Sequence, residues 1–425
     1  MKNKYKVIII FAVAAILGGV LAFGFGIMEN YPEYDIFLQA FSGVAGVALG
    51  YYLSVALNKP ETKNDYTFSA FFALCFSGTI IAVRKFIQFF IDFYTGSNLL
   101  HCEFVEDSHW LYRIFGFGMS PDAQRPLLDT DEDFTVSILF SLISTGVLYL
   151  YGRVKNKSLF IKAEKKEKLR FKSIPSRSQA RIECEIEKMK SDCSIWDFLL
   201  WWCTRAVMLY AFITMENRAE ATLLLANLVA TFAITLVHFI LPKNSVLTNV
   251  SYKAQSLITI IVFLGSWCGN FVGVYFITPR FDLFLHLVSG YLCVMGGYYV
   301  ALTLFKPDSK KKVLLISLFA LFFSFFIMPF WEVSEFIGDF IWGTSNQGFY
   351  WGPTDDSFFF KVFGHGVGNT QLYYLFDTFY DMLLAVVTTI VTFIGLYICL
   401  YVKVKTKPAE RAEVSTEKEK IPSCC

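Results

Sequence analysis

Long apolar segments recur along this 425-residue chain, and each is long enough to cross a lipid bilayer. Hydrophobic residues make up 55% of the chain and charged residues only 17%, which is outside the usual range of a soluble globular protein. Inside a bilayer every backbone amide and carbonyl must be hydrogen-bonded within the protein, and an α-helix achieves this within one segment. The sequence therefore predicts an all-α, polytopic membrane helix bundle.

The apolar segments predict about ten transmembrane helices. The first follows Met1–Lys6 and ends near Gly26; it resembles a signal peptide, but it is long enough to span, and we interpret it as a retained helix. The other nine are expected at about 36–57, 67–94, 129–151, 195–214, 221–241, 254–276, 282–305, 313–342 and 379–402.

Basic residues fall on one side of this alternation of spans. The segment 153–192 carries thirteen Lys or Arg against six Asp or Glu, and further Lys cluster in 58–65 and 306–312. By the positive-inside rule that side is the cytoplasm. We therefore predict a protein of the cytoplasmic membrane with both termini inside, and with the loops 95–130 and 343–374 outside as packed caps.

The chain is internally duplicated. Four separated blocks recur in the same order at a near-constant offset, which chance does not explain. An even number of predicted spans separates the copies, so the two repeats are expected to be parallel and related by an axis near the membrane normal. The matching blocks are Asp35–Gly43 with Asp282–Gly290, Gln88–Gly96 with Glu335–Gly343, Arg113–Gly118 with Lys361–Gly366, and Leu127–Phe134 with Leu375–Met382.

This duplication predicts the organisation of the chain. We expect the following parts: a first transmembrane repeat at 1–152, a solvated basic cytoplasmic linker at 153–194, two connecting transmembrane helices at 195–253, a second transmembrane repeat at 254–402, and a disordered cytoplasmic tail at 403–425. The polar motifs are intact in the second repeat and degenerate in the first.

Titratable residues accumulate in the second copy, on the predicted outer side. Spacings of three or four residues place such pairs on one helical face, and one polar cavity opening outward could collect them. The candidate catalytic residues, with no role assigned to any, are Asp282, His286, Glu332, Glu335, Asp377 and Asp381. Their first-copy counterparts, which we expect to form a second, degenerate cluster, are Asp35, Gln39, Lys85, Gln88, Asp129 and Asp133.

A divalent metal ion is the one cofactor that these residue types suggest. Carboxylates together with an imidazole suit Mg, Mn, Fe or Zn. The hypothetical ligands are Asp282, His286, Glu335 and Asp381. The alternative is a structural network of hydrogen bonds and ion pairs, in which the first-copy cations Arg84 and Lys85 are partners for the excess acids. His238, by contrast, is expected to be a satisfied hydrogen-bonding group between helices.

The second copy resembles the uncharacterised bacterial inner-membrane family typified by YjdF, and more distantly VanZ-type membrane proteins. The resemblance covers about 195–402 and rests on Asp282-xxx-His286-xxx-Gly290, Trp331-Glu332-xx-Glu335 and Asp377-Thr378-xx-Asp381-Met382. It implies a multi-pass protein of the cytoplasmic membrane and points to the cell envelope, without supplying a reaction.

Three functions remain open. The first is an outward-facing acidic and histidine site that binds or processes a lipid or cell-envelope precursor, with metal-assisted chemistry if it is an enzyme. The second is a proton- or cation-coupled transporter, although no Gly- or Pro-broken pair of spans occurs in both halves. The third is a structural or partner-binding scaffold. The expected partners are the bilayer and a lipid or envelope precursor, and no nucleic acid.

Overall fold

A computed structural model describes most of the predicted helical segments. The described residues are 33–95, 121–157, 178–216, 218–241, 246–278, 280–305, 307–342 and 373–413. Every regular element in these ranges is helical, and no strand occurs in them, which confirms the all-α prediction. The first predicted span and most of both predicted outer loops lie outside the described residues.

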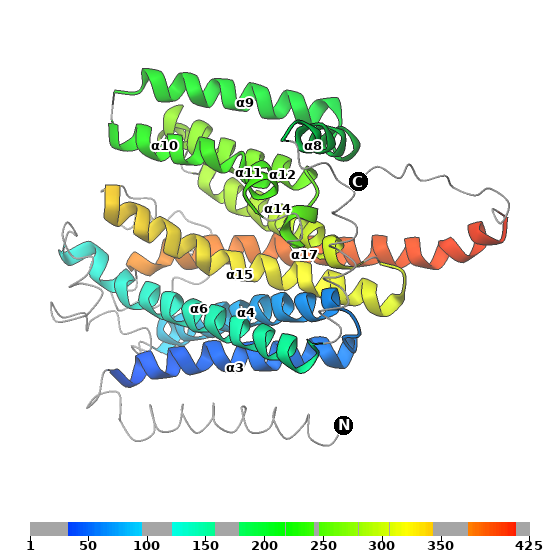
Figure 1. The fold of residues 1–425 in the computed structure, drawn as a ribbon. Coiled ribbons are helices and arrows are strands. Elements are labelled where there is room, and N and C mark those ends of the chain that lie inside the picture. Colours follow the sequence, from blue (N-terminus) through cyan, green and yellow to red (C-terminus); the bar gives the residue numbers. More distant parts are fainter. Residues whose placement is uncertain are drawn as a thin grey trace. The chain divides into compact units, whose positions relative to one another are not determined.

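Six of the described helices are long and apolar enough to cross a membrane, and they coincide with six of the ten predicted spans (Figure 1). Each follows from an uninterrupted apolar run, which satisfies its backbone internally. They are α3 (Glu33–Leu57), α4 (Lys63–Thr95), α6 (Pro121–Lys155), α14 (Arg280–Leu304), α15 (Lys310–Trp342) and α17 (Tyr373–Glu413).

The chain divides into two compact units. The first unit comprises Met1–Leu57, Ser69–Tyr149 and Phe322–Val387, and the second comprises Asn58–Phe68, Leu150–Leu321 and Thr388–Cys425. Because the helices α4, α6, α15 and α17 contribute residues to both, the units do not coincide with the predicted repeats. We describe each unit by itself.

Helix α4 is the central helix of the first unit. Within its most apolar window 72% of the residues are buried, the largest share among the six spanning helices. Small residues allow its neighbours to approach closely, as is common between membrane helices. A Cβ added at Gly46 of α3 would lie 2.9 Å from the Cα of Ser77 in α4, and Gly78 of α4 lies directly against Phe326 of α15. About three turns further along α4, the ring of Phe89 stacks on that of Phe379 in α17, at 4.3 Å.

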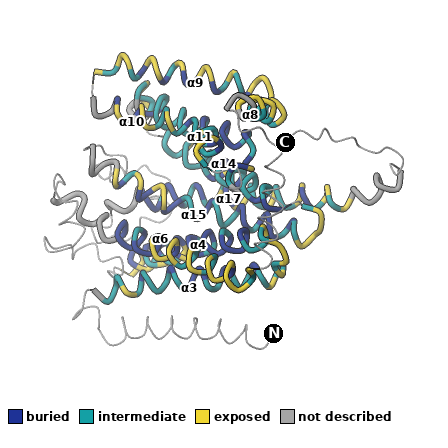
Figure 2. Tube along the Cα trace, viewed as in Figure 1, coloured by how far each residue is buried: buried dark blue, intermediate teal, exposed yellow. Residues whose placement is uncertain are grey.

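The second unit is built from shorter elements around α14. Figure 2 shows that α9 exposes much of one side, whereas α12 is largely shielded. Trp201 of α9 packs in a buried cluster with Ile234, Val250 and Tyr252. The additional elements are α8 (Ser178–Asp192), α9 (Ile195–Thr214), α10 (Arg218–Ala230), α11 (Ala233–Ile240), η2 (Val246–Asn249), α12 (Lys253–Val262), the π-helix η3 (Phe263–Phe271) and α13 (Val274–Ile277).

Two of the other predicted spans, 221–241 and 254–276, are less regular than expected. The predicted helix 221–241 is interrupted at Thr231 and Phe232, which separate α10 from α11. The predicted helix 254–276 begins as α12, widens into the π-helix η3, and turns at Gly273, whose φ of 75° suits a residue without a Cβ. None of these elements belongs to the six spanning helices, so the count of ten spans stays a prediction.

Three predicted boundaries are wrong. Helix α6 begins at Pro121, so Asp129 lies inside a helix and does not open one. The predicted disordered tail is helical to Glu413, because Lys, Glu, Ala and Arg are good helix formers that extend a helix already nucleated by the apolar span. The last part of the predicted solvated linker forms α8, and Met189 of α8 packs against the buried cluster that contains Trp201.

Candidate functional site

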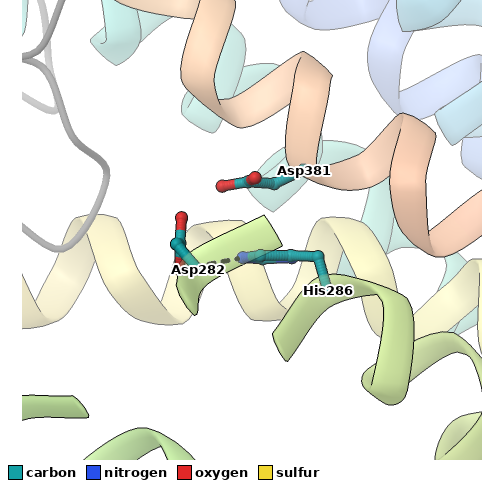
Figure 3. A group of neighbouring side chains, drawn as sticks. All are labelled: Asp282, His286 and Asp381. Atoms are coloured by element: carbon teal, nitrogen blue, oxygen red, sulfur yellow. Dashed lines mark ion pairs between the residues drawn. The ribbon is translucent and has the colours of Figure 1, made fainter. Parts of the chain in front are cut away.

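The second-copy residues Asp282 and His286 form an ion pair on α14. Their spacing of one helical turn brings the Nε2 of His286 to 3.6 Å from the Oδ1 of Asp282 (Figure 3). The Asp282 side chain is 32% exposed and that of His286 is 12% exposed. Asp282 lies in the first turn of α14, where the negative charge of a carboxylate also interacts favourably with the helix dipole. The two residues thus lie on one face of α14, as their spacing predicts.

Three further candidates lie in the first unit, and two of them are deeply buried. Glu332 of α15 is 3% exposed, and Asp381 of α17 is 5% exposed. Glu335 is partly shielded and accepts a hydrogen bond from the Nε1 of Trp331, one turn earlier, at 2.7 Å. Burying carboxyl groups is costly unless they are neutral, paired or bound to a cation. The described side chains do not include that of Asp377.

The candidates are therefore distributed over both units. Asp282 and His286 belong to the second unit, whereas Glu332, Glu335 and Asp381 belong to the first. Figure 3 labels the pair together with Asp381, and its dashed line marks the ion pair on α14. That all six residues line one polar cavity stays a prediction.

The first-copy counterparts contact one another within the first unit. Lys85 of α4 forms an ion pair with Asp133 of α6. The Nη1 of Arg84 donates to the Oε1 of Gln39 at 2.6 Å, and its Nη2 lies 4.0 Å from the Oδ1 of Asp35. The Nε2 of Gln39 donates to the same carboxylate at 3.2 Å. The predicted first-copy cluster is thus confirmed for Asp35, Gln39, Lys85 and Asp133.

This first-copy cluster contains its own cations. Arg84 and Lys85 contact the acids of their own copy, Asp35 and Asp133. Buried ionisable groups in membrane helices usually pair in this way, and such pairing locks helices together. The oxygen of the Gln88 amide is buried and has no hydrogen-bond partner among the described residues. The first copy therefore provides a charge-compensated network that joins α3, α4 and α6.

A second polar cluster, in the second unit, contains His238. Its Nε2 donates to the carbonyl of Val250 at 2.9 Å, and its Nδ1 lies 3.0 Å from the Oε2 of Glu185 in α8. The hydroxyl of Tyr252 donates to the same Glu185 oxygen at 2.7 Å. The prediction that His238 is a satisfied group between helices is confirmed. Burial opposes ionisation of Glu185, but the hydrogen bonds from His238 and Tyr252 hold its pKa below the ordinary value.

Sequence reasoning missed two polar residues of the second unit, Glu185 of α8 and Arg205 of α9. Glu185 lies in the basic segment that we predicted to be a solvated linker, and it gave no separate signal. Arg205 of α9 is only 7% exposed. It is the single charged residue within the apolar run from Phe198 to Thr214, and that isolation was the available signal.

The comparisons with known proteins agree with this description of the second half. Residues 198–401 match a family model described as Predicted membrane protein (DUF2238). No curated protein and no solved structure matches the chain. The match agrees in extent with the resemblance seen at 195–402, and it supports neither the YjdF nor the VanZ-type name. Together with the six apolar helices, it identifies a multi-pass membrane protein.

Proposed function

We propose that the second copy binds a divalent cation, with the Asp282–His286 pair on α14 supplying ligands. The observation that carries this proposal is the Asp282–His286 pair on α14, which combines a carboxylate and an imidazole one turn apart. Both side chains are partly shielded, so few waters compete for their ligand atoms. In our proposal the site faces outward and binds the head group of a lipid or cell-envelope precursor.

The first copy holds a polar pair at the same place. By the offset of the repeat, Asp35 corresponds to Asp282 and Gln39 to His286. Within the first unit the Nε2 of Gln39 donates to Asp35 across one helical turn.

The charges of the two copies support a cation as the ligand. In the first copy Arg84 and Lys85 neutralise the acids. At the corresponding positions the second copy has Trp331 and Glu332, so two cations are replaced by an aromatic ring and a further acid. This more acidic composition suits a divalent cation as the ligand. Carboxylate and imidazole ligands suit Mg, Mn, Fe or Zn.

Such a site would hold an anionic or carbonyl oxygen of a head group on the cation. When bound, the ion would polarise that oxygen, and this is the chemistry that an enzyme of this kind would use. His286 could accept or donate a proton close to it, with Asp282 orienting the imidazole ring through the observed ion pair. Whether the site only binds or also transforms its ligand is decided by experiment.

Metal analysis of the purified protein tests this proposal. After dialysis against metal-free buffer, we expect the parent protein to retain a divalent metal, measured by mass spectrometry of the elements. The substitutions His286→Gln and Asp282→Asn should each weaken metal affinity about 10-fold or more. Asp308→Asn is the matched control. Asp308 is an exposed acid that lies outside α14 and pairs with Lys312. A parent protein that retains no metal, or a His286→Gln variant that binds it normally, contradicts the proposal.

A coupled transporter is the second candidate, and one observation favours it. The chain contains a broken helix, α10 and α11, and a π-helical segment, η3, within segments expected to span the membrane. Discontinuous helices of this kind supply backbone groups to substrates in many transporters. In proteoliposomes carrying a pH gradient, a transporter would produce proton or cation flux that Asp381→Asn abolishes. Absence of flux in the parent protein would exclude this candidate.

A further inference from the structure

Arg205 occupies the break between α10 and α11. Its Nε donates to the Oγ1 of Thr231 at 3.0 Å, and its Nη2 donates to the carbonyl of Thr231 at 2.7 Å. Thr231 lies just past the end of α10, where a helix leaves carbonyl groups without internal partners and carries partial negative charge. Arg205 therefore donates a hydrogen bond to the backbone carbonyl at the break between the two helices.

The remainder of its surroundings is aromatic and apolar. The guanidinium carbon lies 3.7 Å from the ring centroid of Phe232 and 5.6 Å from that of Trp201. Within the described part of the chain, no carboxylate forms an ion pair with Arg205. Arg84 is different, because it lies beside Asp35 and Gln39. Arg205 is thus a buried cation with no anionic partner in these segments.

The hydrogen bonds to Thr231 use only part of the guanidinium. An arginine carries five N–H donors, and the observed contacts engage one on Nε and one on Nη2. The Nη1 group makes no hydrogen bond within the described residues. Only 7% of Arg205 is exposed, so its charge has little access to water, and burying a charge without a counterion is costly. A phosphate or carboxylate can accept two parallel N–H bonds from the guanidinium plane and neutralise its charge.

A second orphan donor lies in the adjoining π-helix. The Nε1 of Trp267 in η3 is buried and has no hydrogen-bond partner among the described residues. Trp267 packs against the buried cluster of Met208, and Met208 lies one turn beyond Arg205 on α9. Asn227, one turn before Thr231, donates to Ser266, the neighbour of Trp267. The unsatisfied groups in this region are therefore N–H donors, and π-helical segments frequently mark functional sites.

We propose that α9, α10 and η3 form a binding site for one oxyanion, the phosphate of a membrane lipid, held by Arg205 with the Trp267 indole as a second donor. The apolar flank of Met208 and Phe232 and the exposed Trp202 and Leu209 on α9 suit an acyl chain better than a freely diffusing ion. This site is separate from the cation site on α14, and neither proposal depends on the other.

Lipid titration of the full-length protein in detergent tests this inference. We would measure the apparent affinity for phosphatidylglycerol and for phosphatidylcholine by native mass spectrometry, together with the melting temperature. The parent protein should bind the anionic lipid more tightly, and Arg205→Gln should weaken that binding ~10-fold or more. Arg84→Gln is the matched control; it removes a paired arginine and should leave the lipid preference unchanged. Inorganic phosphate alone is tested in parallel.

Each outcome has a defined meaning. Equal affinity of the parent protein for the two lipids, or an Arg205→Gln variant that keeps the preference, overturns the site and leaves Arg205 as a cap of the broken helix. Tight binding of inorganic phosphate that depends on Arg205 supports the oxyanion site and overturns the lipid as its source. If Arg205→Gln does not fold, Arg205→Lys should retain the preference with lower affinity, and Thr231→Val should lower the melting temperature while keeping the preference.

Discussion

At the scale of single residues, the two copies differ most in how they neutralise charge. The first copy buries Lys85 against Asp133, whereas the second has an acid, Glu332, at the position of Lys85. Both residues at this repeated position are almost fully buried. A buried charge is tolerated only with compensation, so the identity of the neighbouring cation decides what each copy can do. In the first copy the cation beside Asp133 is the side chain of Lys85.

Lys85→Met should destabilise the protein strongly, because it leaves the buried Asp133 carboxylate without its cation. We expect a loss of about 3–5 kcal/mol in the free energy of unfolding. The double variant Lys85→Met with Asp133→Leu should recover much of this loss, since both charges are then removed. Chemical denaturation in detergent measures both. Lys312→Met is the control: its pair with Asp308 is exposed and should change stability by at most ~1 kcal/mol. Equal effects at the two lysines would contradict the buried network.

At the scale of elements, close contacts and polar clusters hold the helices in place. Gly78 lets α4 meet α15 at Phe326, and the Glu185 cluster attaches α8 to α11 and to Tyr252, the residue before α12. The contact at Gly78 depends on the absence of a Cβ there, and the attachment of α8 depends on the ionised carboxylate of Glu185. These two connections should therefore respond to different perturbations.

Gly78→Ala should be destabilising, because a Cβ there meets the backbone and ring of Phe326. Overpacking of this kind costs about 1–3 kcal/mol. Gly146→Ala in α6 is a matched control, since a Cβ there meets no atom within 4 Å; it should stabilise by about 0.5–1 kcal/mol through helix propensity. Melting temperatures of the two variants check this. Stabilisation by both would show that α4 and α15 are not in tight contact.

The attachment of α8 should depend on pH. The Glu185 carboxyl has a pKa below its ordinary value of 4.5 in the folded protein. A carboxyl with a lowered pKa contributes stability above its ordinary pKa and loses it as the pH falls through the lowered value. The protection of the α8 amides, measured by hydrogen exchange relative to the intrinsic exchange rate at each pH, should therefore fall at acidic pH, below about 4.5.

Glu185→Gln should reproduce this loss at neutral pH. The exposed neighbour Glu187 provides the control, because Glu187→Gln removes an equal charge that makes no contact with the polar cluster. An α8 that stays equally protected in Glu185→Gln would show that the apolar contact of Met189 suffices to hold it.

At the scale of the whole molecule, the duplication and the membrane orientation both stay predictions, and the first unit supports the duplication. Within that unit α4 packs on α15, its counterpart in the second copy, and Gly78 contacts Phe326, which is adjacent to its own counterpart Phe325. Parallel repeats related by a twofold axis are expected to meet at equivalent positions near that axis. This contact is therefore what the predicted repeat symmetry requires.

The orientation can be tested by cysteine labelling. A cysteine placed at Ser173, in the basic segment 153–192, should react with a membrane-impermeant maleimide only after the membrane is permeabilised, because the positive-inside rule places this segment in the cytoplasm. A cysteine at Ser120 should react in intact cells. Labelling of the Ser173 position in intact cells would reverse the predicted topology. The variants are made in a background without native cysteines.

The sequence by itself determined the helical membrane class, six spanning helices and the pairing of Asp282 with His286. These follow from apolar length and from helical spacing, which are properties of a local segment. The duplication also predicted that Asp35, Gln39, Lys85 and Asp133 cluster. Tertiary structure alone decided the break at Thr231, the π-helix η3 and the attachment of α8 through Glu185. Each of these depends on a partner distant in the sequence, such as Arg205 for Thr231, and no local pattern encodes it.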